Sequence, residues 1–176
     1  MKLNGLTFKK YLTASHLKNR VKKLAEKIDL DYQKKTPLLL PVLNGSFIFA
    51  ADLIKQLKVP CKVSFVKHAS YEGTAGGQLK TIIGLNESVF GQDVLIVEDI
   101  MDTGETLKRV SEELKNLGAK SVEFVVLLQK EKSKKNPIKP KYIGFEITNE
   151  FVVGYGLDHN GLGRNFPDVY QVVPNG

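Results

Sequence analysis

Two buried-strand patterns on either side of one helical pattern constrain the fold of this chain more than any other feature. Residues 94–97 read VLIV and residues 121–129 read SVEFVVLLQ, so both are largely apolar. Such runs are typical of strands that are covered on both faces. Over residues 104–117, apolar side chains recur at helical spacing and a glycine follows, as at the end of a helix. This order of strand, helix and strand predicts a parallel α/β sheet with right-handed crossovers.

The amino-terminal part of the chain shows related patterns. Apolar residues over 14–28 lie at i, i+4, i+7, i+8 and i+11, which predicts an amphipathic helix capped near Thr13 or Ser15. The run LLLPVL at residues 38–43 predicts a strand that passes through a tight loop at 44–46 into a second helix. Two more strands are expected at residues 61–70 and 81–85, and the glycine-rich stretch between them, residues 70–77, is expected to be a mobile loop.

Length and composition indicate a single domain. The chain has 176 residues, of which 42% are hydrophobic and 26% are charged, as is typical of globular proteins. No apolar run approaches the ~20 residues that a membrane-spanning helix needs, and residues 1–10 lack the apolar segment of a secretory signal. We therefore expect one cytoplasmic domain over residues 1–176, with no membrane partner. Cys61 is the only cysteine, which excludes an internal disulfide and a cysteine-based zinc cluster.

The positive charge of the chain comes almost entirely from lysine. The net charge is +7, and only three arginines are present. Proteins that read nucleic acids usually draw more on arginine, so no nucleic-acid partner is expected. The lysine excess fits a solvated surface and would also attract a polyanionic small substrate. The densest lysine run, at residues 130–141, contains two prolines and is predicted to be mostly loop.

The segment VLIVEDIMDTGETL at residues 94–107 carries the clearest chemical signal. Ligands of an open parallel sheet bind outside the carboxyl ends of its strands, and Glu98 and Asp99 are expected at such an end. The turn at residues 102–106 then opens a helix, whose free N–H groups and hydroxyls form a cradle for a monophosphate. Gly104 allows the backbone to approach the anion closely. Two acidic groups for diol hydroxyls or magnesium, beside a phosphate-sized turn, predict a ribose 5-phosphate site.

A structural explanation competes with this functional one. Asp102 and Thr103 could merely cap a helix, and the acidic pair could be a solvated strand end. A bare Asp-Thr-Gly would favour the cap. The complete pattern of two acids, two apolar residues and Asp-Thr-Gly-x-Thr directly after a buried strand favours a functional site.

These residues resemble the phosphoribosyl-diphosphate binding motif of the type I phosphoribosyltransferases. The form EDIMDTG at residues 98–104 is similar to the hypoxanthine-guanine branch of that family, and the resemblance extends from about residue 38 to residue 173. It implies that Glu98 and Asp99 contact the ribose hydroxyls and Mg²⁺, and that Asp102 lies near purine N7 as the general base. It also implies that the donor and its 5-phosphate contact Ile100, Thr103, Gly104, Glu105 and Thr106.

Two further segments match the family in the expected order. The loop Leu43-Asn44-Gly45 resembles the loop that meets the pyrophosphate, which can contain a cis peptide. Family members often have Lys or Arg in place of Asn44, so backbone amides are the expected contact here. Taken alone, this loop could equally be a strand-to-helix turn. Ser70 and Tyr71 resemble the head of the catalytic loop that folds over the site and excludes water, although Tyr71 could instead be an ordinary loop anchor.

The last match is spread over the carboxyl-terminal third of the chain. The resemblance implies that Lys130 donates to the exocyclic oxygen of the purine, that Phe151 stacks on its ring, and that the backbone of Val152 reads the ring edge. Asp158 would lie near the metal and the base, with Arg164 on the pyrophosphate. An aromatic face and a lysine donor suit a 6-oxopurine better than adenine. Each of these residues alone also has an ordinary structural explanation.

The resemblance implies an α/β type I phosphoribosyltransferase fold, with a mostly parallel central sheet flanked by helices, a small hood built from the chain ends and a flexible catalytic loop. It implies transfer of the phosphoribosyl group from phosphoribosyl diphosphate to hypoxanthine and guanine, with Mg²⁺ as cofactor, in a homodimer or homotetramer. The alternatives are a phosphoribosyltransferase for xanthine or adenine, an RNA-binding regulator on the same fold, and a doubly wound binding domain without catalysis. The sequence leaves the preference between hypoxanthine and guanine open.

Overall fold

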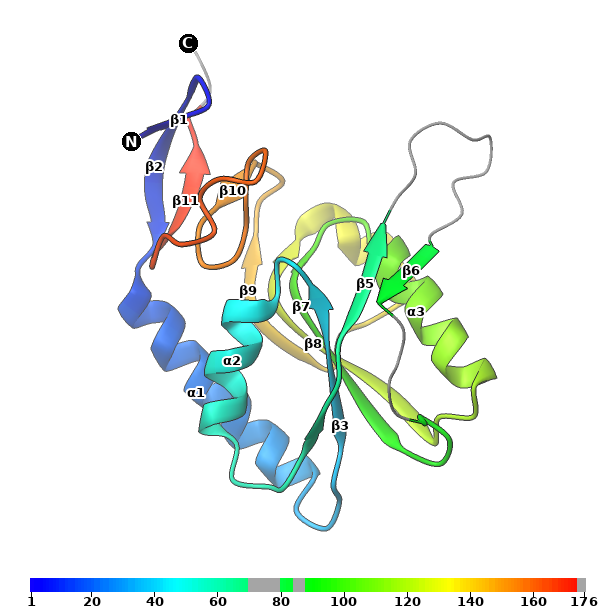
Figure 1. Cartoon of the computed structure of the whole chain (residues 1–176). Helices are drawn as coiled ribbons and strands as arrows, with labels where there is room; N and C mark the ends of the chain where they lie inside the picture. The colour runs from blue at the N-terminus through cyan, green and yellow to red at the C-terminus, as the bar shows by residue number, and fades with distance from the viewer. Residues whose placement is uncertain (70–79, 84–87, 174–176) are drawn as a thin grey trace.

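The computed structural model of the chain describes residues 1–69, 80–83 and 88–173. Two β-sheets and three α-helices make up this part of the chain (Figure 1). The helices are α1 (Ala14–Asp31), α2 (Phe47–Gln56) and α3 (Glu105–Asn116), with a short 3-10 turn, η1 (Glu131–Lys135). The predicted loop residues Ser70 and Tyr71 lie outside the described residues. No helix within the described ranges is both long and apolar enough to cross a membrane.

The larger sheet forms the centre of the molecule. Its strands are β3 (Leu38–Leu43), β4 (Lys62–Val63), β5 (Val66–Ala69), β6 (Lys80–Ile83), β7 (Asp93–Met101), β8 (Ser121–Lys130) and β9 (Tyr142–Ile147). They lie in the order β6-β5-β3-β7-β8-β9, and β4 also pairs with β3. Every pair is parallel except β5 with β6, so the predicted mostly parallel sheet is confirmed. Helices α1 and α2 cover one face, and α3 covers the other (Figure 1).

Alternation along the buried strands divides the core into two layers. Leu39 of β3 and Leu95 of β7 pack with α1 and α2, whereas their neighbours Leu38 and Val94 pack with α3. Successive side chains of a strand point to opposite faces, so an unbroken apolar run is needed where helices cover both faces. Each such side chain contributes about 1.5–3 kcal/mol through its burial. The apolar run at residues 94–97 therefore follows from the central place of β7.

The first helix begins where its sequence predicts. Thr13 is the N-cap of α1, and its side-chain oxygen accepts a hydrogen bond from the His16 N–H at 3.3 Å, which satisfies one free donor of the first turn. The helix continues to Asp31, beyond the predicted end at residue 28. The reason is that the Tyr32 N–H still donates to the Ile28 carbonyl at 3.0 Å.

The predicted strand over residues 61–70 is wrong as a single strand. The structure divides it into β4 and β5, which pair in the same register with the start and the end of β3. The break at Ser64 and Phe65 lies opposite Leu40 and Pro41. Because proline has no N–H to donate to a ladder, the pairing is interrupted at this point.

Strand β7 is longer than its apolar run. It continues through Met101, which still pairs with Gln129 of β8. Glu98 and Asp99 therefore lie within the strand near its carboxyl end, which is the end where the sequence predicts them. The sequence patterns also do not predict β9, a short edge strand whose burial alternates only in part.

The two ends of the chain form the second sheet, which confirms the predicted hood. Its strands are β1 (Lys2–Leu3), β2 (Leu6–Leu12), β11 (Val169–Val172) and β10 (Val152–Val153), in that order. Asn4 and Gly5, with φ of 47° and 79°, make the tight turn between β1 and β2, and both residue types tolerate this backbone. Strands β2 and β11, from opposite ends of the chain, lie side by side (Figure 1).

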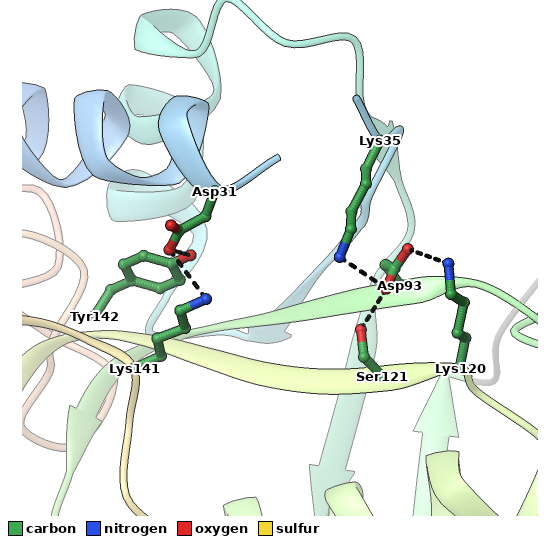
Figure 2. A network of polar contacts seen from close by, with 7 residues as sticks. All are labelled: Asp31, Lys35, Asp93, Lys120, Ser121, Lys141 and Tyr142. Carbon is green, nitrogen blue, oxygen red and sulfur yellow. Dashed lines mark hydrogen bonds and ion pairs between the residues drawn. The ribbon is translucent and has the colours of Figure 1, made fainter. Parts of the chain in front are cut away.

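A polar network lies at the amino-terminal end of the large sheet (Figure 2). Asp93, at the start of β7, accepts a hydrogen bond from Ser121 Oγ at 2.6 Å. Its carboxylate also pairs with Lys120 Nζ at 3.3 Å and with Lys35 Nζ at 3.5 Å. A second group of contacts beside it involves Asp31, Lys141 and Tyr142. These contacts join α1 and the segment before β3 to the starts of β7, β8 and β9.

Candidate active site

A cavity of about 350 Å³ lies at the carboxyl end of the large sheet. This is the place where open α/β sheets bind ligands. Its lining residues are Val42, Leu43, Gly45, Glu98, Asp99, Ile100, Asp102, Lys130, Phe151, Val152, Leu157, Asp158 and Arg164. A smaller hollow of about 100 Å³ at the start of α3 shares part of this wall and is lined by Glu98, Ile100, Met101, Asp102, Thr103, Gly104, Thr106 and Leu107.

Two larger hollows lie elsewhere on the described surface. One, of about 530 Å³, lies between α1, α2 and residues 155–167. The other, of about 520 Å³, lies between the end of α1 and the segment before β4. Neither contains the acidic pair or the turn at residues 102–106. The cavity at the sheet end is the better candidate because it gathers carboxyl groups whose pKa values are perturbed.

The acidic pair is the most unusual feature of this cavity. Only 6% of the surface of Asp99 is exposed, and Glu98 Oε2 is buried without a hydrogen-bond partner among the described residues. Burial, and then the neighbouring Asp99 charge, raises the pKa of Glu98 well above its usual value. Burial also raises the pKa of Asp99. A pair of this kind needs a ligand that donates hydrogen bonds or carries positive charge.

The loop after β3 presses its backbone against this pair. Gly45 lies so close to Asp99 that a Cβ atom at this position would overlap the carboxylate, so only glycine fits. The preceding Leu43-Asn44 peptide is cis. Leu43 and Gly45 line the cavity, whereas Asn44 is not among its lining residues.

The turn at residues 102–106 has the backbone form of an anion cradle. Gly104 has a φ of 87° and is the N-cap of α3. The first N–H groups of the helix have no partner within it, and the helix dipole favours negative charge at this end. Thr103, Gly104 and Thr106 line the smaller hollow. The 5-phosphate contact at this turn stays a prediction.

Two lysines hold the Asp102 side chain. Its Oδ1 atom lies 2.7 Å from Lys132 Nζ and 3.3 Å from Lys130 Nζ. Burial raises the pKa of Asp102, but the hydrogen bond from Lys132 and the charge of Lys130 outweigh burial, so the pKa lies below its usual value. Lys130 ends β8 and Lys132 lies on η1. The sequence patterns do not reveal Lys132, because its only signal is one more lysine within a lysine-rich run.

Phe151 and Lys130 form the wall where the predicted purine would lie. Phe151 is 39% exposed. Its ring makes an edge-to-face contact with the ring of His159, at a centroid distance of 5.3 Å. The exposed part of the Phe151 ring can stack on a base. Val152 and Leu157 add apolar lining, and Leu157 is another residue that the sequence patterns do not indicate.

Arg164 and Asp158 also line the cavity, and they pair with each other. Arg164 Nη2 lies 2.7 Å from Asp158 Oδ1, and Nη1 donates to the Gly156 carbonyl at 2.6 Å. The other Asp158 oxygen accepts a hydrogen bond from the Gly161 N–H at 2.7 Å. Each oxygen of Asp158 thus has one partner and keeps a lone pair free for a further contact. The metal role of Asp158 stays a prediction.

Most of the predicted site residues thus line one of two connected hollows. Asn44 and Glu105 are the described exceptions, since neither belongs to either lining. Ser70 and Tyr71 cannot be placed because they lie outside the described ranges. Within those ranges, no group of three or more His, Cys, Asp and Glu side chains is arranged to hold a metal ion.

Comparison with known proteins identifies the family of the chain. Residues 8–160 match the family model described as "Phosphoribosyl transferase domain", so the chain belongs to the phosphoribosyl transferase family. It is 44% identical over 155 residues to the hypoxanthine-guanine phosphoribosyltransferase of Lactococcus lactis, covering 87% of this chain and 84% of that relative. The corresponding enzyme of Staphylococcus aureus is 39% identical over 165 residues, with 93% and 92% covered. Within the family, the chain therefore falls in the hypoxanthine-guanine branch.

Solved structures support the same placement. The hypoxanthine phosphoribosyltransferase of Staphylococcus aureus is 38% identical with a TM-score of 0.89, over 97% of this chain and 94% of that one. A mutant of the Trypanosoma cruzi enzyme, solved with the product IMP, is 33% identical with a TM-score of 0.88, over 99% of this chain and 94% of that one. The predicted type I phosphoribosyltransferase fold is confirmed.

Proposed function

We propose that this protein is a purine salvage enzyme that transfers the 5-phosphoribosyl group of phosphoribosyl diphosphate to hypoxanthine and guanine. The products are IMP or GMP and pyrophosphate. One observation carries the proposal: the acidic pair, the turn at residues 102–106 and a wall of Phe151 and Lys130 line two hollows that share Glu98, Ile100 and Asp102. A nucleoside monophosphate has the matching three parts, which are ribose hydroxyls, a phosphate and a base.

The residues of the site divide the chemistry between them. Purine N9 forms a bond to the anomeric carbon of the ribose while the bond from that carbon to pyrophosphate breaks. The Asp102 carboxylate accepts the proton that leaves N7, and its lysine partners keep it ionised for this task. Glu98 and Asp99 orient the ribose, and the turn at residues 102–106 holds the 5-phosphate, so the reacting atoms are aligned before the reaction.

Mg²⁺ fits the acidic pair. Magnesium keeps several waters and binds through one or two carboxylates plus substrate phosphates, and Glu98 offers a buried oxygen with no partner among the described residues. Glu98 and Asp99 would hold the ion, and Asp158, which lines the same cavity, would join them. A bound ion supplies positive charge to the departing pyrophosphate. Arg164 supplies further positive charge at the same cavity.

Lys130 is the residue that selects the base. An ammonium group donates hydrogen bonds and accepts none, so it complements the 6-oxygen of hypoxanthine and guanine and opposes the amino group of adenine. Lys130 lines the same cavity as Phe151, which suits a purine stacked on that ring. Xanthine also carries a 6-oxygen, so a xanthine-directed enzyme is the alternative of the same class.

We also propose that the protein is a single cytoplasmic domain and a homodimer or homotetramer. One solved relative, the Trypanosoma cruzi enzyme, is 32% identical with a TM-score of 0.89, and its structure addresses how the C-terminal region of that enzyme affects its oligomeric state. We further propose that Ser70 and Tyr71 belong to a loop that closes over the site and excludes water from the reaction.

A steady-state assay of four bases with phosphoribosyl diphosphate and Mg²⁺ tests the proposal. We expect turnover with hypoxanthine and guanine and none with adenine. Lys130→Ala should raise the KM for hypoxanthine, because a hydrogen bond from a charged donor contributes about 1.5–3 kcal/mol. Turnover with xanthine or adenine alone would favour an enzyme for another base. Absence of pyrophosphate release with every base, together with salt-dependent RNA binding, would favour the RNA-binding regulator.

A further inference from the structure

The phosphate turn carries an acidic side chain that opposes its proposed task. Glu105 is the first residue of α3 and lies in the turn that would hold a dianionic phosphate. A carboxylate at a helix N-terminus competes with a phosphate for the same N–H groups and the same end of the helix dipole. The Glu105 carboxylate must therefore be held elsewhere if the turn is to bind an anion.

Asn136 contacts the Glu105 side chain and the turn together. Its Nδ2 donates to Glu105 Oε1 at 3.3 Å and to the Thr103 carbonyl oxygen at 3.0 Å. Its Oδ1 accepts a hydrogen bond from the Ile138 N–H at 2.9 Å. An asparagine amide has two N–H donors and one carbonyl, so both of its polar ends are used. Asn136 is only 7% exposed, which leaves its side chain little freedom to turn elsewhere.

Glu105 differs from its neighbours in the turn in its position relative to the hollow. Every residue from 100 to 107 lines the smaller hollow except Glu105. A Cβ atom at Gly104 would lie 2.5 Å from Met101 Cε and 2.9 Å from Asn136 Cγ, so glycine at this position lets both side chains pack closely against the turn. Glu105 is therefore outside the lining of the hollow, and its carboxylate is held by Asn136.

We propose that Asn136 is a positioning residue of the donor site, which keeps the Glu105 carboxylate turned away from the 5-phosphate. The inference rests on the proposed function, because that function places the 5-phosphate at this turn. Asn136 itself contacts no reacting atom and acts through Glu105. Loss of Asn136 should therefore weaken binding of phosphoribosyl diphosphate, and should leave proton transfer and selection of the base unchanged.

Kinetics of two single variants and their combination test this role. Asn136→Leu removes the donors and keeps a side chain of similar size, so the carboxylate can return to the helix N-terminus. We expect the KM for phosphoribosyl diphosphate to rise about 10-fold, with kcat and the KM for hypoxanthine within about 2-fold of their original values. Adding Glu105→Gln to Asn136→Leu should restore most of the donor affinity, because no charge is left to compete with the phosphate.

The matched control adds Glu112→Gln to Asn136→Leu. Glu112 is an exposed acid on the same helix but outside the turn, so its removal should restore nothing. A second variant, Asn136→Asp, keeps an acceptor for the Ile138 N–H and replaces the donor by an oxygen. Asn136→Asp should also raise the KM for phosphoribosyl diphosphate and leave the other constants unchanged. The test therefore does not depend on how well leucine packs.

Two results would overturn the role of Asn136. One is an unchanged donor KM in both Asn136 variants, and the other is a failure of Glu105→Gln to restore affinity. Calorimetric binding of IMP separates this inference from the proposed function, because it needs no turnover. An original protein that neither binds IMP nor releases pyrophosphate would refute the proposed function. An original protein that does both, with variants that bind IMP equally well, would refute only the role of Asn136.

Discussion

Asp102 has to be ionised before it can accept a proton, and its two lysines provide for this. If Lys130 turns to the purine 6-oxygen as proposed, Lys132 at 2.7 Å remains as the partner of the carboxylate. Glu98 and Asp99 lie deeper in the cavity and have raised pKa values because of their burial. At the scale of residues, the site thus separates a carboxylate suited to proton transfer from a pair suited to the ribose and the metal.

Replacement of Asp102 tests this division. Asp102→Asn keeps the shape of the side chain and removes its basicity, so turnover should fall by ~10²–10⁴. The KM for phosphoribosyl diphosphate should change little. Asp99→Asn is the matched variant and should instead raise the donor KM and the Mg²⁺ requirement, as measured by steady-state kinetics. Near-full turnover of Asp102→Asn with weakened donor binding would make Asp102 a helix cap and refute the general-base role.

At the scale of elements, Asp93 connects the starts of several strands (Figure 2). The hydrogen bond from Ser121, aided by Lys120 and Lys35 and opposed by burial, holds the pKa of Asp93 below its usual value. Both lysines are largely exposed, so water and salt screen their charges and the Ser121 contact carries most of the effect. A carboxylate whose pKa is lower in the folded than in the unfolded chain stabilises the fold only while it is ionised.

The free energy of unfolding should therefore depend on pH through Asp93. Asp93→Asn should lower it by about 1.5–3 kcal/mol at neutral pH, the range for hydrogen bonds to a charged group. The difference from the original protein should shrink as the pH falls below the usual aspartate pKa of 3.8 and through the lower folded-state value. Urea unfolding at several pH values measures it. A difference that stays constant with pH would contradict this account, and Glu112→Gln on the surface of α3 serves as the control.

At the scale of the whole molecule, the segment between β10 and β11 packs against the loop after β3 and so helps to enclose the cavity. Gly156 has a φ of 101°, and a Cβ atom there would overlap the Gly45 carbonyl oxygen. Gly45 in turn lies against Asp99. The segments around Gly45, Asp99 and Gly156, which are far apart in sequence, are therefore in close contact. Residues from all three segments line the cavity.

Alanine substitutions at two glycines measure this packing. Gly161 has a φ of 80° and no atom within 4 Å of the added Cβ, so Gly161→Ala should cost only the backbone strain of about 1–2 kcal/mol. Gly156→Ala should cost that strain plus about 1–3 kcal/mol for overpacking, and it should raise the KM of both substrates. Urea unfolding and steady-state kinetics give the two readouts. Equal losses in both variants would show that the contact between Gly156 and Gly45 is not tight.

The sequence by itself determined the elements whose signals are local. Apolar periodicity and the cap at Thr13 act between near neighbours, which is why α1, α3 and the strands at residues 38–43 and 94–97 could be predicted. The acidic pair and the turn at residues 102–106 could be predicted for the same reason, since they are contiguous. The roles of Lys130, Phe151 and Arg164 came from resemblance to a family, because nothing local distinguishes one lysine or one phenylalanine from another.

The tertiary structure alone decided the features that depend on partners far along the chain. The break between β4 and β5 depends on Pro41 in the neighbouring strand, and β9 is a strand chiefly because β8 offers it an edge. The pairs Lys132 with Asp102 and Asn136 with Glu105 join segments that the sequence separates. Such contacts leave no periodic signal in the sequence, because the side chains come within reach of each other only when the folded sheet has brought their segments together.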